Sequence, residues 1–172
     1  MTIVLIGAPG AGKTRVGKRL GPRLGREFID TDRVIAAEHG AIAEIFAEHG
    51  EAHFRRLERQ VVAEALTHDA VVSLGGGAVL DADTQADLAG ATVIRLTVSA
   101  DAVTARIANG KRPLVTSIES WQKLVDSRSG LYESLADYTT DTSDRSIDAI
   151  VEELAEWVES NTVPEGNTEA SR

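Results

Sequence analysis

The feature that most constrains this sequence is a glycine-rich segment that directly follows an apolar run at the N-terminus. The apolar run is Thr2-Ile3-Val4-Leu5-Ile6, and the segment is Gly7-Ala8-Pro9-Gly10-Ala11-Gly12-Lys13-Thr14. Its spacing, Gly-x4-Gly-Lys-Thr, is typical of a loop that joins a buried strand to a helix and wraps its backbone N–H groups around a phosphate. The pattern therefore predicts a nucleotide-binding α/β domain; the alternative is a glycine-rich turn with an incidental lysine.

The polar side chains of this loop have distinct expected roles. Lys13 is expected to reach the β- and γ-phosphates of ATP, and the Thr14 hydroxyl is expected to ligate Mg²⁺. The residues expected to bind ATP in this segment are Gly10, Ala11, Gly12, Lys13, Thr14 and Arg15. The motif alone does not separate kinases from GTPases, ATPases or regulatory switches.

Downstream of the loop, short runs rich in β-branched residues alternate with segments of helical period, which is typical of a parallel sheet flanked by helices. Strands are predicted at residues 2–6, 27–30, 71–74, 92–97 and 138–141. Helices are predicted at residues 13–24, 33–38, 42–48, 52–66, 84–88, 100–107, 120–135 and 147–159. The expected fold class is therefore α/β, with a five-stranded parallel sheet.

The length of 172 residues, 42% of them hydrophobic, is enough for one domain with a sizeable core. We expect that domain to span residues 1–160, with a helical insertion at about 32–62 and a second long connection at about 108–117. Long connections in α/β proteins tend to carry function. Residues 161–172 are polar and are expected to form a disordered tail.

Charge and cysteine content limit the partners of the chain. A formal net charge of -9 disfavours nucleic acid and anionic membranes, and the apolar start is too short to cross a bilayer. The absence of cysteine fits a reducing compartment, so a cytoplasmic protein is expected. We also expect a small-molecule substrate and a monomeric state. Anionic ligands must be held by a few local cations, which makes the position of each arginine informative.

This sequence lacks the characteristic elements of two classes of nucleotide-binding protein. A GTPase needs a guanine-reading segment such as Asn-Lys-x-Asp, which Asn109-Gly110-Lys111 does not match. A mechanical ATPase normally has a strand that ends in Asp-Glu, whereas the third predicted strand runs into Ser73-Leu74-Gly75-Gly76-Gly77. Small-molecule kinases remain as the expected class.

The second predicted strand ends in Asp30-Thr31-Asp32, at the edge of the sheet where ligands of open α/β folds bind. Strand alternation is expected to send both carboxylates to the same side. Asp30 can then hold waters of Mg²⁺, while Asp32 can accept the proton of an attacking hydroxyl. The alternative is that Asp32 is the N-cap of the next helix.

Three further patterns each have a functional and a structural interpretation. Arg55 and Arg56 either face water, as paired arginines usually do, or provide a cation for an anionic ligand. The triplet Gly75-Gly76-Gly77 either lets backbone approach a ligand closely or forms a plain tight turn. Lys111-Arg112-Pro113 either supplies a cation that closes over the phosphates or is a solvated pair beside a helix stop.

Taken in order, these segments resemble the shikimate kinase family. The resemblance runs from residue 3 to about residue 145 and rests on several motifs in the right order and spacing. The motifs are Gly7 to Thr14, Asp30-Thr31-Asp32, Ile45-Phe46 with Gly50-Glu51 and Phe54-Arg55, Gly75-Gly76-Gly77, Arg112-Pro113-Leu114, and Arg128 with Leu131-Tyr132. Two stretches depart from the family pattern: the chain is one residue shorter between Gly40 and Ile42, and Gly130 replaces a proline.

The resemblance implies a three-layer α/β/α fold of the nucleoside-monophosphate-kinase type, with sheet order 2-3-1-4-5, that transfers the γ-phosphate of ATP to the 3-hydroxyl of shikimate in the route to chorismate. It implies Asp32, Lys13 and Arg112 as catalytic residues, and Thr14 and Asp30 at the metal. Implied substrate-binding residues are Asp32, Arg55, Gly75, Gly76, Gly77 and Arg128, with Arg106, Arg112 and Arg145 as further ATP contacts. The alternatives are a kinase of another small polyol or nucleotide, and a nucleotide-binding regulator that has lost catalysis.

Overall fold

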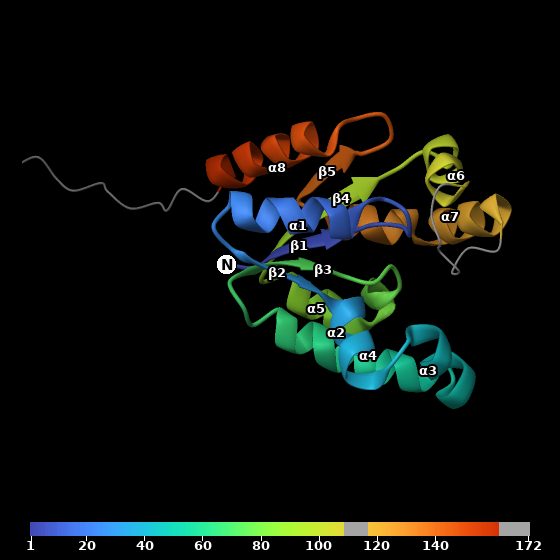
Figure 1. Cartoon of the computed structure of the whole chain (residues 1–172). Helices are drawn as coiled ribbons and strands as arrows, with labels where there is room; N and C mark the ends of the chain where they lie inside the picture. Colours follow the sequence, from blue (N-terminus) through green and yellow to red (C-terminus); the bar gives the residue numbers. More distant parts are fainter. Residues whose placement is uncertain (109–116, 162–172) are drawn as a thin grey trace, which may run out of the picture.

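The computed structural model describes residues 1–108 and 117–161, which form a five-stranded sheet with helices on both faces (Figure 1). The strands are β1 (Ile3–Ile6), β2 (Glu27–Asp30), β3 (Ala70–Ser73), β4 (Thr92–Thr97) and β5 (Tyr138–Asp141). Their order is β2-β3-β1-β4-β5, and each neighbouring pair runs parallel. The predicted fold class, strand number and strand order are confirmed.

The eight predicted helices are all present, and each begins and ends within about two residues of its predicted bounds, the usual uncertainty of helix ends. They are α1 (Lys13–Arg23), α2 (Thr31–His39), α3 (Ile42–His49), α4 (Glu51–Ala65), α5 (Ala82–Leu88), α6 (Ala100–Ala108), α7 (Ile118–Leu135) and α8 (Ile147–Asn161). A 3-10 turn, η1 (Ala78–Leu80), follows the glycine triplet and was not predicted. Helix α7 continues unbroken through Gly130, so the glycine does not interrupt it.

Alternation along the central strand β1 divides the core into two layers. Ile3 and Leu5 pack with residues of α1 and α8 on one face of the sheet. Val4 and Ile6 pack with residues of α4, α5 and α7 on the other. Because both faces are covered, all four residues are buried, which explains the continuous apolar run in the sequence. Burying one such side chain stabilises the fold by roughly 1.5–3 kcal/mol.

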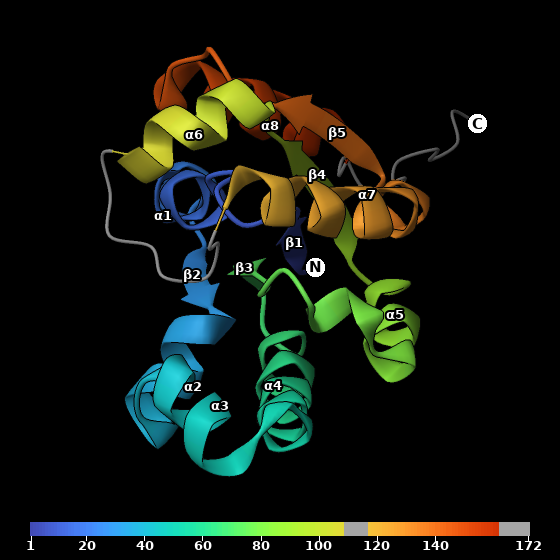
Figure 2. The same ribbon diagram turned by 90° about the vertical axis from the view of Figure 1, so that its right-hand side faces the viewer.

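The carboxyl ends of the strands face two groups of helices (Figure 2). Helices α2, α3 and α4 lie on one side of the strand ends, and α6 and α7 lie on the other (Figure 2). Ile35, Ile45 and Phe54 form a separate buried cluster that joins α2, α3 and α4 to one another. The predicted insertion at 32–62 therefore has a small core of its own.

Some predicted features lie outside the described residues. These are Lys111, Arg112 and Pro113 of the second long connection, and the tail from residue 162 onward. Helix α8 reaches Asn161, so the first residue of the expected tail is helical instead. Among residues 1–108 and 117–161, none of the helices combines the length and the apolar character needed to cross a bilayer.

Candidate active site

The loop between β1 and α1 has a backbone that requires glycine at both ends of the motif. Gly7 has a φ of 144°, and a Cβ added to it would overlap the carbonyl oxygen of Leu96 in β4. Gly12 has a φ of 91° and lies in the left-handed region at the start of α1. The predicted arrangement of strand, glycine loop and helix is therefore present, and a side chain at either position would strain it.

Lys13 and Thr14 begin helix α1, and their side chains bind different partners. The Lys13 ammonium donates to the carbonyl oxygens of Gly7 at 2.7 Å and Ala8 at 3.1 Å, so its charge lies over the loop. The Thr14 hydroxyl donates to Oδ2 of Asp30 at 2.6 Å. The two residues predicted to support a metal are thus brought into direct contact.

Asp30, rather than Asp32, is the N-cap of helix α2. Its Oδ1 accepts from the backbone N–H of Arg33 at 3.2 Å. The interpretation of Asp32 as a helix cap is therefore wrong. The argument from strand alternation is also wrong, because α2 begins at Thr31 and places Asp32 in the first helical turn.

The Asp32 carboxyl is half-buried beside the groups with which it was predicted to act. Burial raises its pKa above the usual value of 3.8, and the nearby Asp30 carboxylate acts in the same direction. Lys13 and Arg55 oppose the shift, which locates Asp32 within electrostatic reach of both cations. A carboxyl with this environment is a candidate general base.

The glycine triplet after β3 leaves room for three charged side chains. A Cβ on Gly75 would lie 2.7 Å from Oδ1 of Asp32 and 2.9 Å from Oε1 of Glu58. A Cβ on Gly77 would lie 2.5 Å from both terminal nitrogens of Arg55. The triplet also makes a turn, since the N–H of Ala78 donates to the Gly75 carbonyl at 3.1 Å. Close approach of side chains, and not turning alone, accounts for the glycines.

A cavity of about 150 Å³ brings together all six predicted substrate-binding residues. It is lined by Pro9, Asp32, Ile42, Phe46, Phe54, Arg55, Glu58, Gly75, Gly76, Gly77, Leu124 and Arg128. Pro9 belongs to the phosphate-binding loop, so the cavity directly adjoins that loop. Two guanidinium groups and one carboxyl group that could serve as a base therefore meet next to the place where a nucleotide phosphate is expected.

The two neighbouring arginines of α4 have different environments. The Arg55 guanidinium forms an ion pair with Glu58 at 2.5 Å and lies 5.4 Å from the centre of the Phe54 ring. Arg56 is exposed to solvent. The interpretation of the pair as a solvated surface feature therefore applies to Arg56 and not to Arg55.

Among the charged residues that line the cavity, Glu58 is the one that the sequence interpretation missed. It is only 4% exposed and, besides pairing with Arg55, lies close to Gly75. Its signal was present in the sequence, because Phe54, Glu58, Val62 and Ala65 form the buried stripe of α4 at helical spacing. A charged residue in an apolar stripe rarely occurs without a partner. Burial raises the pKa of Glu58, while its hydrogen bond with Arg55 opposes the rise.

Replacing Glu58 with glutamine is expected to change how stability depends on pH. Because the folded-state pKa of Glu58 is raised above its usual value of 4.5, the folded protein binds this proton more tightly than the unfolded chain. The wild type should therefore lose stability relative to Glu58→Gln as the pH rises from about 4 through that pKa. Thermal unfolding of both proteins across this range measures the difference.

Glu51→Gln is the matched control, since it alters the exposed partner of the same guanidinium, 3.4 Å from Arg55. The difference in Tm between Glu58→Gln and wild type could instead stay constant with pH or change in the opposite direction. Either result would contradict the assignment of Glu58 as a buried carboxyl with a raised pKa.

The remaining arginines predicted to contact ATP have separate locations. Arg106 of α6 donates to the Gly10 carbonyl at 2.7 Å and to the Thr142 carbonyl at 2.5 Å, so it holds the loop against the segment after β5. Arg145 contacts Thr140 and pairs with Glu153 of α8 at 2.5 Å. Arg15 is exposed on the first turn of α1.

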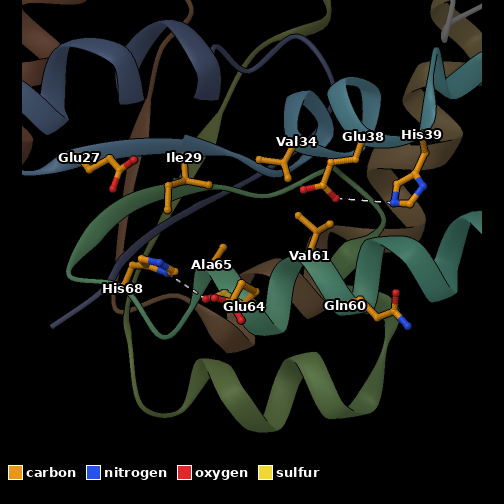
Figure 3. Close-up of a pocket in the computed structure, with 10 residues that line it drawn as sticks. All are labelled: Glu27, Ile29, Val34, Glu38, His39, Gln60, Val61, Glu64, Ala65 and His68. Atoms are coloured by element: carbon orange, nitrogen blue, oxygen red, sulfur yellow. Dashed lines mark hydrogen bonds and ion pairs between the residues drawn. The ribbon is translucent and has the colours of Figure 1, made fainter.

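A larger cavity, of about 360 Å³, lies between β2, α2 and α4 (Figure 3). Its polar lining comes from Glu27, Glu38, His39, Gln60, Glu64 and His68. Figure 3 shows these side chains around an apolar centre, where Ile29 of β2 and Val61 of α4 project from opposite sides of the cavity. Its lining contains three carboxylates and neither lysine nor arginine, which disfavours ATP or an acidic substrate. The smaller cavity is therefore the candidate active site despite its size.

Comparison with known proteins identifies the family. A sequence model of the shikimate kinase family matches residues 9–159. The shikimate kinase of Streptomyces coelicolor is 42% identical over 162 residues, which cover 91% of this chain and 95% of the relative. This chain belongs to the shikimate kinase family. The shikimate kinase of Thermobifida fusca is 46% identical over 157 residues, covering 88% of this chain and 91% of the relative.

The shikimate kinase fold extends over nearly the whole chain. The solved structure of the Acinetobacter baumannii shikimate kinase in complex with shikimate matches with a TM-score of 0.85 and 33% identity, covering 95% of each chain. The resemblance inferred from the ordered motifs is thus confirmed. Shikimate kinases are ATP-dependent phosphotransferases, which agrees with the class that remained after GTPases and mechanical ATPases were set aside.

Proposed function

We propose that this chain transfers the γ-phosphate of ATP to the 3-hydroxyl of shikimate, giving shikimate 3-phosphate and ADP. The observation that carries the proposal is the cavity beside the phosphate-binding loop, which combines Asp32 with Arg55 and Arg128. This set of charges suits an acceptor that carries both a carboxylate and a reactive hydroxyl. The match to the structure of a shikimate kinase in complex with shikimate supports the same acceptor.

Arg55 and Arg128 are proposed to bind the substrate carboxylate. A guanidinium group presents a rigid fork of N–H donors that matches the two oxygens of a carboxylate. Arg55 comes from α4 and Arg128 from α7, so the two cations approach the cavity from different elements. The triplet Gly75 to Gly77 forms part of the cavity wall, and its lack of Cβ atoms lets the Arg55 guanidinium and the Asp32 carboxyl lie directly against the backbone.

Asp32 is proposed to act as the general base. Its carboxylate accepts the proton of the acceptor hydroxyl as that oxygen bonds to the γ-phosphorus, and the bond from phosphorus to the bridging oxygen of ADP breaks. Lys13 is proposed to stabilise the negative charge on the phosphoryl oxygens, together with Arg112. Burial of Asp32 strengthens it as a base, because a raised pKa increases its affinity for the proton.

Thr14 and Asp30 are proposed to hold Mg²⁺. Their oxygens, 2.6 Å apart, are the hard ligands that Mg²⁺ prefers, and so few protein ligands suit an ion that keeps waters and binds substrate phosphates. When bound, Mg²⁺ neutralises charge on the β- and γ-phosphates. The N-cap hydrogen bond from Arg33 fixes the orientation of the Asp30 carboxylate for this role.

Release of ADP with different acceptors tests the proposed function. Purified protein with Mg-ATP is assayed against shikimate, gluconate, adenylate and cytidylate. Shikimate is expected to stimulate ADP release far more than the other three. Stronger stimulation by another acceptor, or no stimulation by shikimate, would reject the assignment.

The proton affinity of Asp32 gives a separate prediction about pH. Burial and the Asp30 charge are expected to make the Asp32 carboxyl titrate above its usual pKa of 3.8 in the free protein. Carbon-detected NMR of side-chain carboxyls measures this directly, and the resonance absent from Asp32→Asn identifies the group. Titration of that resonance below pH 3.8 would exclude the proposed environment.

A further inference from the structure

The indole of Trp121 holds the phosphate-binding loop by its backbone. Its Nε1–H donates to the carbonyl oxygen of Pro9 at 2.8 Å. Trp121 lies near the start of α7 and is only 2% exposed. When a buried indole donates its one N–H to a loop carbonyl, the hydrogen bond fixes the orientation of both the ring and the peptide unit.

A second helix holds the next carbonyl of the same loop. Arg106 of α6 donates to the carbonyl oxygen of Gly10 at 2.7 Å. Helices α6 and α7 therefore each contribute one side chain to consecutive carbonyls of the loop. This pairing orients the two peptide units between Pro9 and Ala11.

The orientation of the Pro9 carbonyl determines where the Gly10 N–H points. The two groups belong to one planar peptide unit, and no cis peptide is found in the described chain, so they point in opposite directions. A carbonyl held toward Trp121 therefore directs the Gly10 N–H away from α7. In loops of this spacing, backbone N–H groups are the donors to the phosphates.

Packing keeps the indole in place. Trp121 forms a buried cluster with Ala8 of the loop and Val103 of α6. Pro9 also lines the acceptor cavity, and its Cδ lies 3.3 Å from the position of a Cβ on Gly76. The peptide held by Trp121 therefore belongs to the part of the phosphate-binding loop that borders the acceptor cavity.

We propose that Trp121 is a positioning residue for phosphoryl transfer. Its indole N–H sets the Pro9–Gly10 peptide so that the Gly10 N–H faces the nucleotide phosphates. The inference rests on the proposed function in that the bound phosphates are those of ATP. Trp121 itself touches neither substrate; it acts through the loop backbone.

Trp121→Phe tests the role because it keeps an aromatic ring and removes the N–H donor. Loss of this hydrogen bond is expected to raise the KM for ATP and the Kd for ADP by about 5- to 10-fold. The KM for shikimate is expected to stay within about twofold of wild type. Trp157→Phe is the matched control, since Trp157 stacks on Tyr138 in another part of the molecule. Unchanged ATP and ADP parameters in Trp121→Phe would overturn the proposal.

Fluorescence gives a readout that loss of packing alone would not produce. The chain has two tryptophans, so Trp157→Phe reports on Trp121 alone. Its emission is expected to change saturably as Mg-ADP is added, whereas that of Trp121→Phe stays constant. If the emission of Trp157→Phe does not change although calorimetry records ADP binding, the proposal is overturned. If the wild type binds ADP but fails to phosphorylate shikimate, the proposed acceptor is wrong, and the ADP affinities still decide the role of Trp121.

Discussion

Asp32→Asn is expected to lower kcat for phosphorylation of shikimate by about 10²- to 10⁴-fold, the usual contribution of a positioned general base. Asparagine is close in size to aspartate but cannot accept the hydroxyl proton. Asp32 lines the acceptor cavity within electrostatic reach of Lys13, and the similar size of asparagine means that no other change of geometry is expected. Steady-state kinetics with saturating ATP and shikimate measure the effect.

Two controls separate loss of the base from loss of structure. The Kd for ADP should stay within about twofold of wild type, since nucleotide binding depends on the loop. The Tm at neutral pH should not fall, because a carboxyl with a raised pKa in the folded state costs stability when it is ionised, and asparagine removes that cost. A variant with wild-type kcat would show that Asp32 is not the base.

Arg128→Ala is expected to raise the KM for shikimate by about 10- to 100-fold, since hydrogen bonds to charged groups are worth about 1.5–3 kcal/mol. Arg128 lines the cavity, and its Nη1 lies 3.5 Å from the position of a Cβ on Gly76. The KM for ATP should change little, because the proposed contact is with the acceptor carboxylate. Full kinetics with each substrate varied in turn measure both constants.

Arg56→Ala is the matched control for the loss of one positive charge. Arg56 is exposed and is absent from the cavity lining, so its removal changes net charge equally without altering the site. Its kinetic constants are expected to match the wild type. Equal increases in both KM values for Arg128→Ala would show that Arg128 does not bind the substrate carboxylate.

Much of the fold could be predicted from local sequence patterns. The apolar run Ile3–Ile6 is continuous because β1 is covered on both faces, and the glycines of the following loop are required by backbone geometry. These signals are contained within a few residues. The sheet order, by contrast, came from the family resemblance, since strand pairing joins segments far apart in the sequence.

Other features depend on contacts between distant elements and could not be predicted in this way. The Trp121 indole meets the Pro9 carbonyl across more than a hundred residues, and no local pattern indicates such a pair. The assignment of the helix cap to Asp30 depended on where α2 begins, which sequence patterns give only to within a residue or two. Glu58 is different, because its position in the buried stripe of α4 was readable from the sequence.

The central claim is the transfer of phosphate to one hydroxyl of shikimate, and the product itself tests it most directly. Wild-type protein is incubated with Mg-ATP and shikimate, and the product is examined by two-dimensional phosphorus–proton NMR. The account predicts a new phosphorus resonance correlated with the proton on carbon 3, appearing together with ADP. A correlation with another ring proton, or release of ADP without any phosphorylated shikimate, would contradict it.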